Sequence, residues 1–419
     1  MQNTKLSGQP IICQLLSLIP KELVSNLVQE CESDKYYKTL KTYKQLVFML
    51  FGVISKSGSL TSLCKCLLLL ENKLTYVDIT ELPAKSTLSD ANIKRKSAVF
   101  EKIYFALLEH HKSDLTSIWM VEDINGEASC TKLKRFDSTT IPLFNDIFKG
   151  AGRLSLEGEK SGGIKAQTLL AFNSLVPEYI LLGEASKNDK DFLGQLVVKK
   201  GHCYVFDKGY VNYQVFKRWT DEGVHFVTRL NENASYTVLK HEKGDHFDCI
   251  NGEGILIDEL ITLKLKGSKS GLELRLVTYK DPETGKLLKF ITNQMEYKAL
   301  TIALIYKNRW QIEVFFKKLK QNFQLDYFYS DSPEGIKTQI WIVLIANLIF
   351  SVFHKRSKEN EQFTTIVSIA RQGLCSYVCF VSIIKEKKLE KNDRNLEIVQ
   401  QTLFELKGGG VFEKNKKDP

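Results

Sequence analysis

The sequence contains no apolar run long enough to span a membrane. The most apolar stretch of its 419 residues, 340–353, falls short of the roughly 18 residues that a membrane helix needs, and it includes Asn347 and Ser351. We therefore expect this stretch to form a buried core helix, and we expect no membrane partner.

Signals for secretion and for zinc binding are also absent. Residues 1–10 are polar and lack the basic and apolar regions of a signal peptide. The nine cysteines show no double CxxC pattern and no Cys/His spacing typical of zinc sites. Cys64, Cys66, Cys375 and Cys379 lie in apolar helical contexts, where buried free thiols are the commoner outcome. The sequence thus predicts reduced cysteines in a cytoplasmic protein.

Acidic residues are outnumbered by basic ones. The sequence has 59 Lys and Arg residues against 49 Asp and Glu residues, which gives a formal net charge of +10. A basic protein attracts polyanions through electrostatic steering and through the release of their counterions. Charge therefore favours a nucleic acid as partner, although many proteins without such a partner are equally basic.

The N-terminal region shows helical periodicity. Apolar residues recur at helical spacing from Lys21 to about His111, which predicts a mostly α-helical domain over residues 1–125. Its cations form either a DNA-end-binding surface or a solvated helix face, and the sequence leaves both open. The cations in question are Lys35, Lys38, Lys41, Lys44, Lys94, Arg95 and Lys96.

From about Thr131 the pattern changes to short β-rich runs. Strands are predicted at 132–138, 166–172, 179–184, 202–206 and 224–228, with helices at 189–198 and 213–222. This order predicts an α/β fold with a mixed sheet. A β-rich insertion is predicted at about 231–293, with alternation in 272–279, a turn at 281–285 and a strand at 287–292. The catalytic domain would then cover 126–360.

Two long helices follow the insertion, at about 295–323 and 336–354. The first contains Tyr306, Arg309, Glu313 and Lys320, which fall within about 60° of one another on a helical wheel and form one polar stripe. Apolar residues on the adjacent face would pack on the sheet and fix the direction of this stripe. The C-terminal region, 361–419, is predicted to be helical and then to end in a disordered basic tail.

A single acid, Glu313, stands among cations on this helix. The simplest interpretation is an i,i+4 salt bridge with Arg309 on a solvated face. Two further acids favour a functional interpretation. Asp137 ends an otherwise apolar and basic predicted strand and Asp207 ends an apolar one, and catalytic groups of α/β sheets tend to lie at strand ends. A strand-end aspartate alone is more often a cap or a turn former.

These segments together resemble the insertion sequence four family of DDE transposases. The resemblance rests on Asp137-Ser-Thr, Asp207-Lys-Gly-Tyr, Val-Thr-Arg229 and a Y-x2-R-x3-E-x6-K signature from Tyr306 to Lys320. The gaps of 207 − 137 = 70 and 313 − 207 = 106 residues suit a family with a β insertion before its glutamate. The resemblance is strong over about 131–354 and looser over the N-terminal region.

The resemblance implies a ribonuclease H-like fold in which Asp137, Asp207 and Glu313 bind two Mg²⁺ ions, with Mn²⁺ as a substitute. Such a site cuts DNA at the element's terminal inverted repeats and joins the 3′-OH ends to target DNA. The implied DNA contacts are Tyr306, Arg309, Lys320, Arg229 and Lys317. A homodimer on double-stranded DNA, associated with the bacterial nucleoid, is expected because two ends must be brought together.

Several interpretations stay open at this point. A two-metal nuclease that cuts without joining would use the same three carboxylates, and an inactive transposase-derived DNA-binding protein would keep the basic surface. Trp219 and Trp310 are interpreted as core residues, since tryptophan at helical spacing is more often core than a base-stacking platform.

Overall fold

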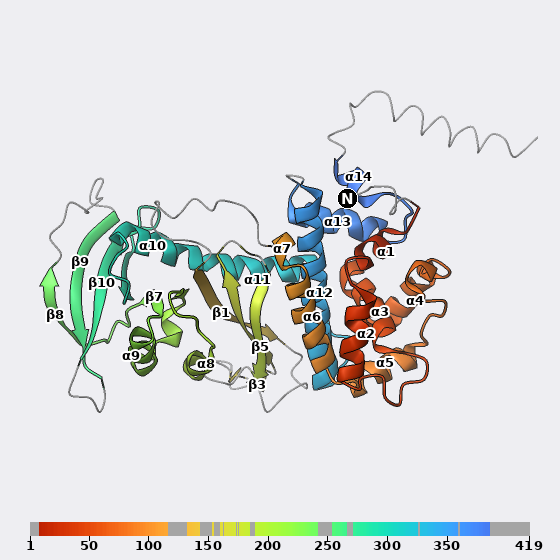
Figure 1. The fold of residues 1–419 in the computed structure, drawn as a ribbon, viewed down its shortest axis with the longest axis horizontal. Helices are drawn as coiled ribbons and strands as arrows, with labels where there is room; N and C mark the ends of the chain where they lie inside the picture. The colour runs from red at the N-terminus through yellow and green to blue at the C-terminus, as the bar shows by residue number, and fades with distance from the viewer. Residues whose placement is uncertain are drawn as a thin grey trace, which may run out of the picture.

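The computed structural model describes residues 8–115, 132–142, 153–154, 160–161, 163–172, 174, 176–184, 189–241, 254–265, 271–325, 327–358 and 361–385. The predicted basic tail lies outside the described residues. The described chain forms a helical body at one end and a long sheet at the other, and helix α11 (Gln311–Asn322) runs between them (Figure 1).

The N-terminal part is helical, as predicted. Helix α3 (Thr42–Ser55) is its most buried element, because nearly every side chain from Gln45 to Ile54 lies in the core. Ser59 begins α4, where its side-chain oxygen accepts a hydrogen bond from the Ser62 N–H at 3.0 Å. The other elements are α1 (Ile11–Leu16), α2 (Lys21–Glu30), α4 (Leu60–Leu67), η2 (Leu68–Leu70), η3 (Thr75–Val77), α5 (Lys85–Lys94), α6 (Ala98–His110) and α7 (Lys112–Leu115).

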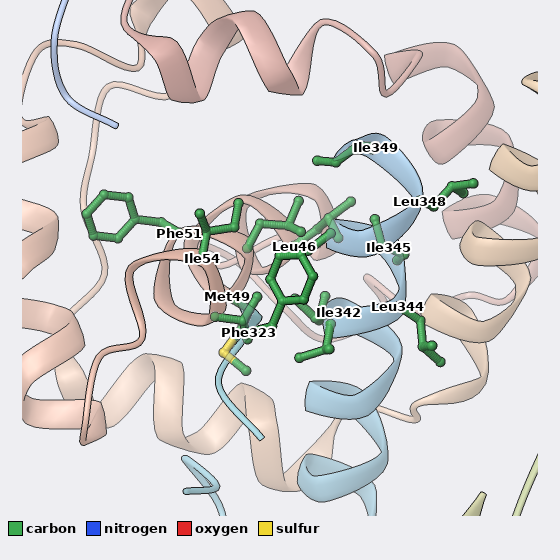
Figure 2. Packing of buried hydrophobic residues seen from close by; sticks show 14 of the residues in the cluster. Leu46, Met49, Phe51, Ile54, Phe323, Ile342, Leu344, Ile345, Leu348 and Ile349 are labelled. Carbon is green, nitrogen blue, oxygen red and sulfur yellow. The ribbon is translucent and has the colours of Figure 1, made fainter. Parts of the chain in front are cut away.

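Helix α12 (Pro333–Ser357) forms the axis of the helical body. It packs on α3, α5 and α6, and α13 (Phe363–Gly373) and α14 (Phe380–Lys385) lie beside it (Figure 1). Figure 2 shows Leu46 of α3 and Phe323 beside Ile342 and Ile345 of α12. The expectation that its apolar stretch is too short was wrong, because this helix is long and apolar enough to cross a membrane. However, 89% of its most apolar window is buried inside the protein. The prediction of a buried core helix is confirmed.

One nine-stranded sheet forms the other end of the molecule, with the order β5-β4-β1-β6-β7-β11-β10-β9-β8. Strands β1, β6 and β7 are parallel, and the pairs on both sides of them are antiparallel, so the predicted mixed α/β sheet is confirmed. Its strands are β1 (Leu133–Pro142), β4 (Gly163–Ala171), β5 (Pro177–Glu184), β6 (Cys203–Val205), β7 (His225–Arg229), β8 (Tyr236–His241), β9 (Gly254–Leu263), β10 (Leu272–Lys280) and β11 (Leu287–Thr292). The short strands β2 (Arg153–Leu154) and β3 (Lys160–Ser161) pair separately.

The β-rich region after β7 extends this same sheet. Strand β11 pairs with β7, so β8 to β11 continue outward from the parallel strands. The predicted turn joins β10 to β11, and Gly285 adopts a φ of +66° there, a conformation that favours glycine. The insertion therefore adds four strands to the sheet on the β7 side of Asp207.

Helices cover both faces of the sheet. Helices α8 (Asp189–Gln195) and α9 (Tyr213–Asp221) pack on one face, against a cluster that includes Phe136 and Phe206. Helix α10 (Ala299–Lys307) packs on the opposite face, against a cluster that includes Leu133, Val205 and Val227. Because side chains alternate along a strand, residues an even number of positions from these three point toward α10.

The predicted single helix over 295–323 is in fact two helices. A 3₁₀ turn, η5 (Asn308–Trp310), separates α10 from α11 (Gln311–Asn322). Arg135 of β1 donates to both the backbone and the side-chain oxygen of Asn308, which ties this turn to the sheet. The tightened turn sets the direction in which Arg309 points.

Candidate active site

The strand register places Asp137, Asp207 and Arg229 side by side. Arg135 of β1 lies opposite Val205 of β6, and Val205 lies opposite Val227 of β7. Asp137, Asp207 and Arg229 each lie two positions after the residue of this row that belongs to the same chain segment: Arg135, Val205 and Val227, respectively. All three side chains therefore point to the face covered by α10, two positions past the last parallel pairing of β1, β6 and β7. Asp137 lies within β1, which continues to Pro142, so the prediction that it ends its strand was wrong.

The α10–η5–α11 segment brings its polar stripe onto this row. The Tyr306 hydroxyl donates to Asp207 Oδ1 at 3.0 Å. The Arg309 guanidinium bridges two acids, with Nη1 donating to Asp137 Oδ2 at 2.6 Å and Nη2 donating to Glu313 Oε1 at 2.8 Å. The i,i+4 salt bridge is therefore present, but it is half of a larger cluster that joins the helix to β1.

Burial and charge shift the titration of Asp137. The pKa of Asp137 is raised to about 6, chiefly because the carboxyl is taken out of water. The Arg309 cation and the N–H of Ser138, which donates to Asp137 Oδ1 at 2.8 Å, lower the pKa; the negative charges of Asp207 and Glu313 raise it. The charges of Asp207 and Glu313 thus act on Asp137, and the three acids together would attract a further cation in addition to Arg309.

Replacement of Asp137 by asparagine is expected to stabilise the metal-free protein. Asp137 binds its proton more tightly in the folded than in the unfolded chain, so the free energy of unfolding falls as pH rises from about 4 to about 6. At pH 7, Asp137→Asn should increase that free energy by about 1–3 kcal/mol, and at pH 4 it should have no effect. Urea unfolding at both pH values measures this.

A matched control for that experiment is Asp221→Asn, which changes an aspartate on α9 whose side chain is 57% exposed. The control should change the free energy of unfolding by less than about 0.5 kcal/mol at either pH. If Asp137→Asn at pH 7 has a free energy of unfolding equal to or lower than that of the wild-type protein, burial of the charged Asp137 carboxylate does not cost stability and the prediction is wrong.

The remaining predicted DNA contacts lie around this cluster. Arg229 is close enough to Tyr306 for its charge to act on the tyrosine hydroxyl, whose pKa is raised mainly by burial. Lys317 is exposed and Lys320 is half-buried on α11. Within the described part of the chain, no hydrogen bond or ion pair joins either lysine to the three acids.

The two tryptophans differ in their surroundings. Trp219 is fully buried, so the prediction of a core residue is confirmed. The same prediction was wrong for Trp310, which is 47% exposed. Helical spacing misplaced it because η5 is wound more tightly than an α-helix, and the turn presents Trp310 to solvent beside Arg309.

Arg135 is a residue of this region that the sequence pattern did not single out. It is 2% exposed and donates to the carbonyl oxygens of Ala171, Phe172 and Ser174 as well as to Asn308. It therefore anchors η5 to β1. The available signal was a cation two positions before Asp137, which side-chain alternation places on the same face of the strand.

The donor set suits a hard divalent cation. Carboxylate oxygens are the ligands that Mg²⁺ prefers, and three acids act on one another here. In the described structure, no three His, Cys, Asp or Glu side chains are close enough to share one metal ion. Arg309 holds Asp137 and Glu313 and so provides the positive charge between them.

A model of a known protein family matches this part of the chain. The transposase DDE domain matches residues 132–349, which include both aspartates, the glutamate and all nine strands of the long sheet. This chain belongs to that family. The transposase also matches, over residues 7–77, a domain family of unknown function.

Curated relatives of this transposase carry related names. It is 29% identical over 279 residues to a putative transposase, y4zB, of Sinorhizobium fredii, covering 64% of this chain and 71% of that one. It is 23% identical over 356 residues to a putative transposase for the insertion sequence element IS4SA of Synechocystis, covering 84% and 94%. It is 26% identical to the transposase InsG for IS4 of Escherichia coli over 176 residues, covering 40% and 39%. The resemblance to the insertion sequence four family is confirmed.

Among solved structures, this transposase is similar to a chain of a piggyBac transposase synaptic complex with hairpin DNA. The TM-score is 0.43 and the sequence identity is 11%, over 100% of this chain and 88% of that one.

Proposed function

We propose that this transposase cuts DNA at the ends of its insertion sequence and joins the freed 3′-OH ends to target DNA. The observation that carries the proposal is the convergence of Asp137, Asp207 and Glu313, linked through Arg309 and Tyr306. Acids placed together in one partly buried site are costly unless a cation or a reaction requires them. A phosphoryl-transfer site has such a requirement.

The proposed fold of the catalytic domain is ribonuclease H-like. The sheet order β5-β4-β1-β6-β7, with three antiparallel strands next to two parallel ones, supports this proposal. We propose residues 126–360 as the catalytic domain, 1–125 as a helical DNA-end-binding domain and 361–419 as a C-terminal region. Helices α12 and α13 pack against α3, so the C-terminal part of the catalytic domain and the helical domain share a core.

Asp137, Asp207 and Glu313 are proposed to hold two Mg²⁺ ions, for which Mn²⁺ can substitute. Bound there, the ions would supply charge neutralisation at the attacking and leaving oxygens of the phosphodiester. Tyr306 keeps the Asp207 carboxylate oriented, and the Ser138 N–H does the same for Asp137. These second contacts limit how far each carboxylate can rotate away from the site.

Arg309 is proposed to move from the two acids to the phosphates that flank the scissile bond. Its guanidinium offers a fork that suits a phosphate, and its buried Nε–H has no hydrogen-bond partner among the described residues. Arg229 at the end of β7 and Lys320 and Lys317 along α11 would extend this phosphate-binding row. The reaction needs no covalent protein intermediate.

The proposed partners are double-stranded DNA at the terminal inverted repeats and at the target, and a second copy of the chain in the DNA complex. The proposed location is the cytoplasm of a bacterium, in association with the nucleoid. The net charge of +10 supports the polyanionic partner.

A strand-transfer assay separates the proposal from a nuclease with the same carboxylates. Purified protein is given pre-cleaved duplex ends with free 3′-OH groups, a supercoiled target plasmid and Mg²⁺. We expect joined products in which the end is covalently attached to the plasmid, and none with 3′-dideoxy ends. Cleavage of intact duplexes without any joining would favour the nuclease.

A further inference from the structure

A basic groove opens on the helical body, away from the three acids. It has a volume of about 1040 Å³ and lies between the 31–40 segment, which connects α2 to α3, and helices α5 and α6. Six cations and two acids, Glu32 and Asp90, line it, a local excess of 6 − 2 = +4. The cations are Lys35, Lys38, Lys94, Arg95, Lys96 and Lys102.

Most of these charges face solvent. Lys35 and Lys94 form ion pairs with the two acids of the groove, but their side chains stay 53% and 65% exposed. Such exposed pairs contribute little to stability and open readily to an anionic ligand. Lys38 and Lys96 are exposed and form no ion pair with any acid of the described residues. The groove therefore offers ammonium groups that a polyanion can reach.

The 31–40 segment is held rigidly by Arg95. The Arg95 side chain, 1% exposed, donates to the carbonyl oxygens of Ser33 and Leu40 at 3.1 and 2.9 Å and forms an ion pair with Asp34 at 3.3 Å. Asp34 in turn accepts from the backbone N–H of Thr42 at 2.6 Å. The Arg95 guanidinium also lies 3.9 Å from the centre of the Tyr37 ring. This network fixes the position of the groove's wall.

Tyr36 stands at the rim of this wall with its ring in solvent. It is 92% exposed and has a φ of +69°, a left-handed conformation that is unfavourable for a bulky residue. Backbone strain persists only where the surrounding structure imposes it, and it is concentrated at functional sites. Surfaces that bind single-stranded nucleic acid combine an exposed aromatic ring with neighbouring cations in this way. On a duplex, the Tyr36 ring between Lys35 and Lys38 can meet only a sugar or an unstacked end base.

We propose that this groove binds the sugar-phosphate backbone of double-stranded DNA, with Lys38 and Lys96 on phosphates and Tyr36 against a sugar or an end base. The inference rests on the proposed function for its ligand, but it concerns a surface separate from the carboxylates. Backbone contacts carry no sequence information, so the groove contributes affinity for any duplex and positions it on the helical body.

Salt-dependent binding tests the groove. Fluorescence anisotropy with labelled duplexes, one from an element end and one unrelated, compares wild type with Lys38→Ala/Lys96→Ala. We expect about tenfold weaker binding to both duplexes near 0.1 M salt, and a slope of log K against log salt that is smaller by about 2, because two phosphate contacts are lost. Lys38→Gln/Lys96→Gln should behave in the same way.

Two controls sharpen the result. Lys65→Ala/Lys286→Ala removes two exposed lysines outside the groove and should leave affinity and slope unchanged. Tyr36→Ala should weaken binding by about fivefold or more, whereas Tyr36→Phe should bind like wild type, because stacking needs the ring and not the hydroxyl.

Unchanged affinity and unchanged slope in both groove double variants would overturn the proposal and would point to another ligand, such as an acidic protein segment. This failure is distinguishable from failure of the proposed function. If the protein cuts DNA with Mg²⁺ but the groove variants bind DNA like wild type, only the groove proposal is wrong. If the groove variants bind DNA more weakly but the wild-type protein does not cut, only the catalytic proposal is wrong.

Discussion

Single substitutions of the three acids are expected to abolish DNA cleavage while leaving DNA binding intact. Asp137→Asn, Asp207→Asn and Glu313→Gln each remove one anionic ligand and keep the shape of the side chain. We expect each to lower the cleavage rate by about 1,000-fold or more, equal to about 4 kcal/mol of transition-state stabilisation. Cleavage of an end-labelled duplex in Mg²⁺ measures the rate, and anisotropy without metal measures binding.

The structure offers a control for charge alone. Glu283→Gln changes an exposed glutamate in the turn between β10 and β11, and it should cut like wild type. If any of the three active-site variants cuts DNA at nearly the wild-type rate, the substituted residue is not a ligand of the proposed metal site. Loss of DNA binding together with cleavage would instead show that the carboxylate maintains the fold of the site.

Arg309 is expected to have the next largest effect. In the described structure it neutralises Asp137 and Glu313, and in the proposed reaction it transfers to the phosphates. Arg309→Ala should therefore slow cleavage about 100-fold or more, the usual loss for a positioned donor at a developing charge. Arg309→Lys should recover only part of this loss, because an ammonium group cannot form the two-pronged contact.

A second measurement separates this role from a merely structural one. The charge of Arg309 lowers the pKa of Asp137, so that pKa should rise further in Arg309→Ala. At the same time Arg309 no longer competes for the carboxylates, and the Mg²⁺ concentration that gives half-maximal cleavage should fall. A cleavage rate equal to wild type, with an unchanged Mg²⁺ requirement, would contradict the proposed transfer.

Local signals in the sequence predicted most of the sheet and singled out both aspartates, although Asp137 lies within β1 and not at its end. Asp137 and Asp207 were visible because an acid stands out in or after a strand whose other residues are apolar or basic. The signature helix was visible because its polar residues fall on one stripe. These features depend on residues close together in the chain, where periodicity is informative.

The contacts between distant segments could not be predicted from local pattern. Nothing near Asp137 indicates that β1 lies beside β6, which follows it by more than one intervening hairpin and a helix. The break at η5 depends on Arg135, which lies 173 residues before Asn308 in the chain. For the same reason, Trp310 was misplaced in the core and the Arg309–Asp137 ion pair was not anticipated.

Cleavage of a duplex that carries the gene's own flanking DNA tests whether Asp137, Asp207 and Glu313 form a metal-dependent DNA-cutting site. Purified protein is incubated with this duplex with and without Mg²⁺, beside Glu313→Gln, and the cut positions are mapped. We expect cutting at the element end that requires Mg²⁺ and is absent in the variant. Tight binding with no cutting by the wild-type protein, under conditions in which two ends can pair, would contradict it.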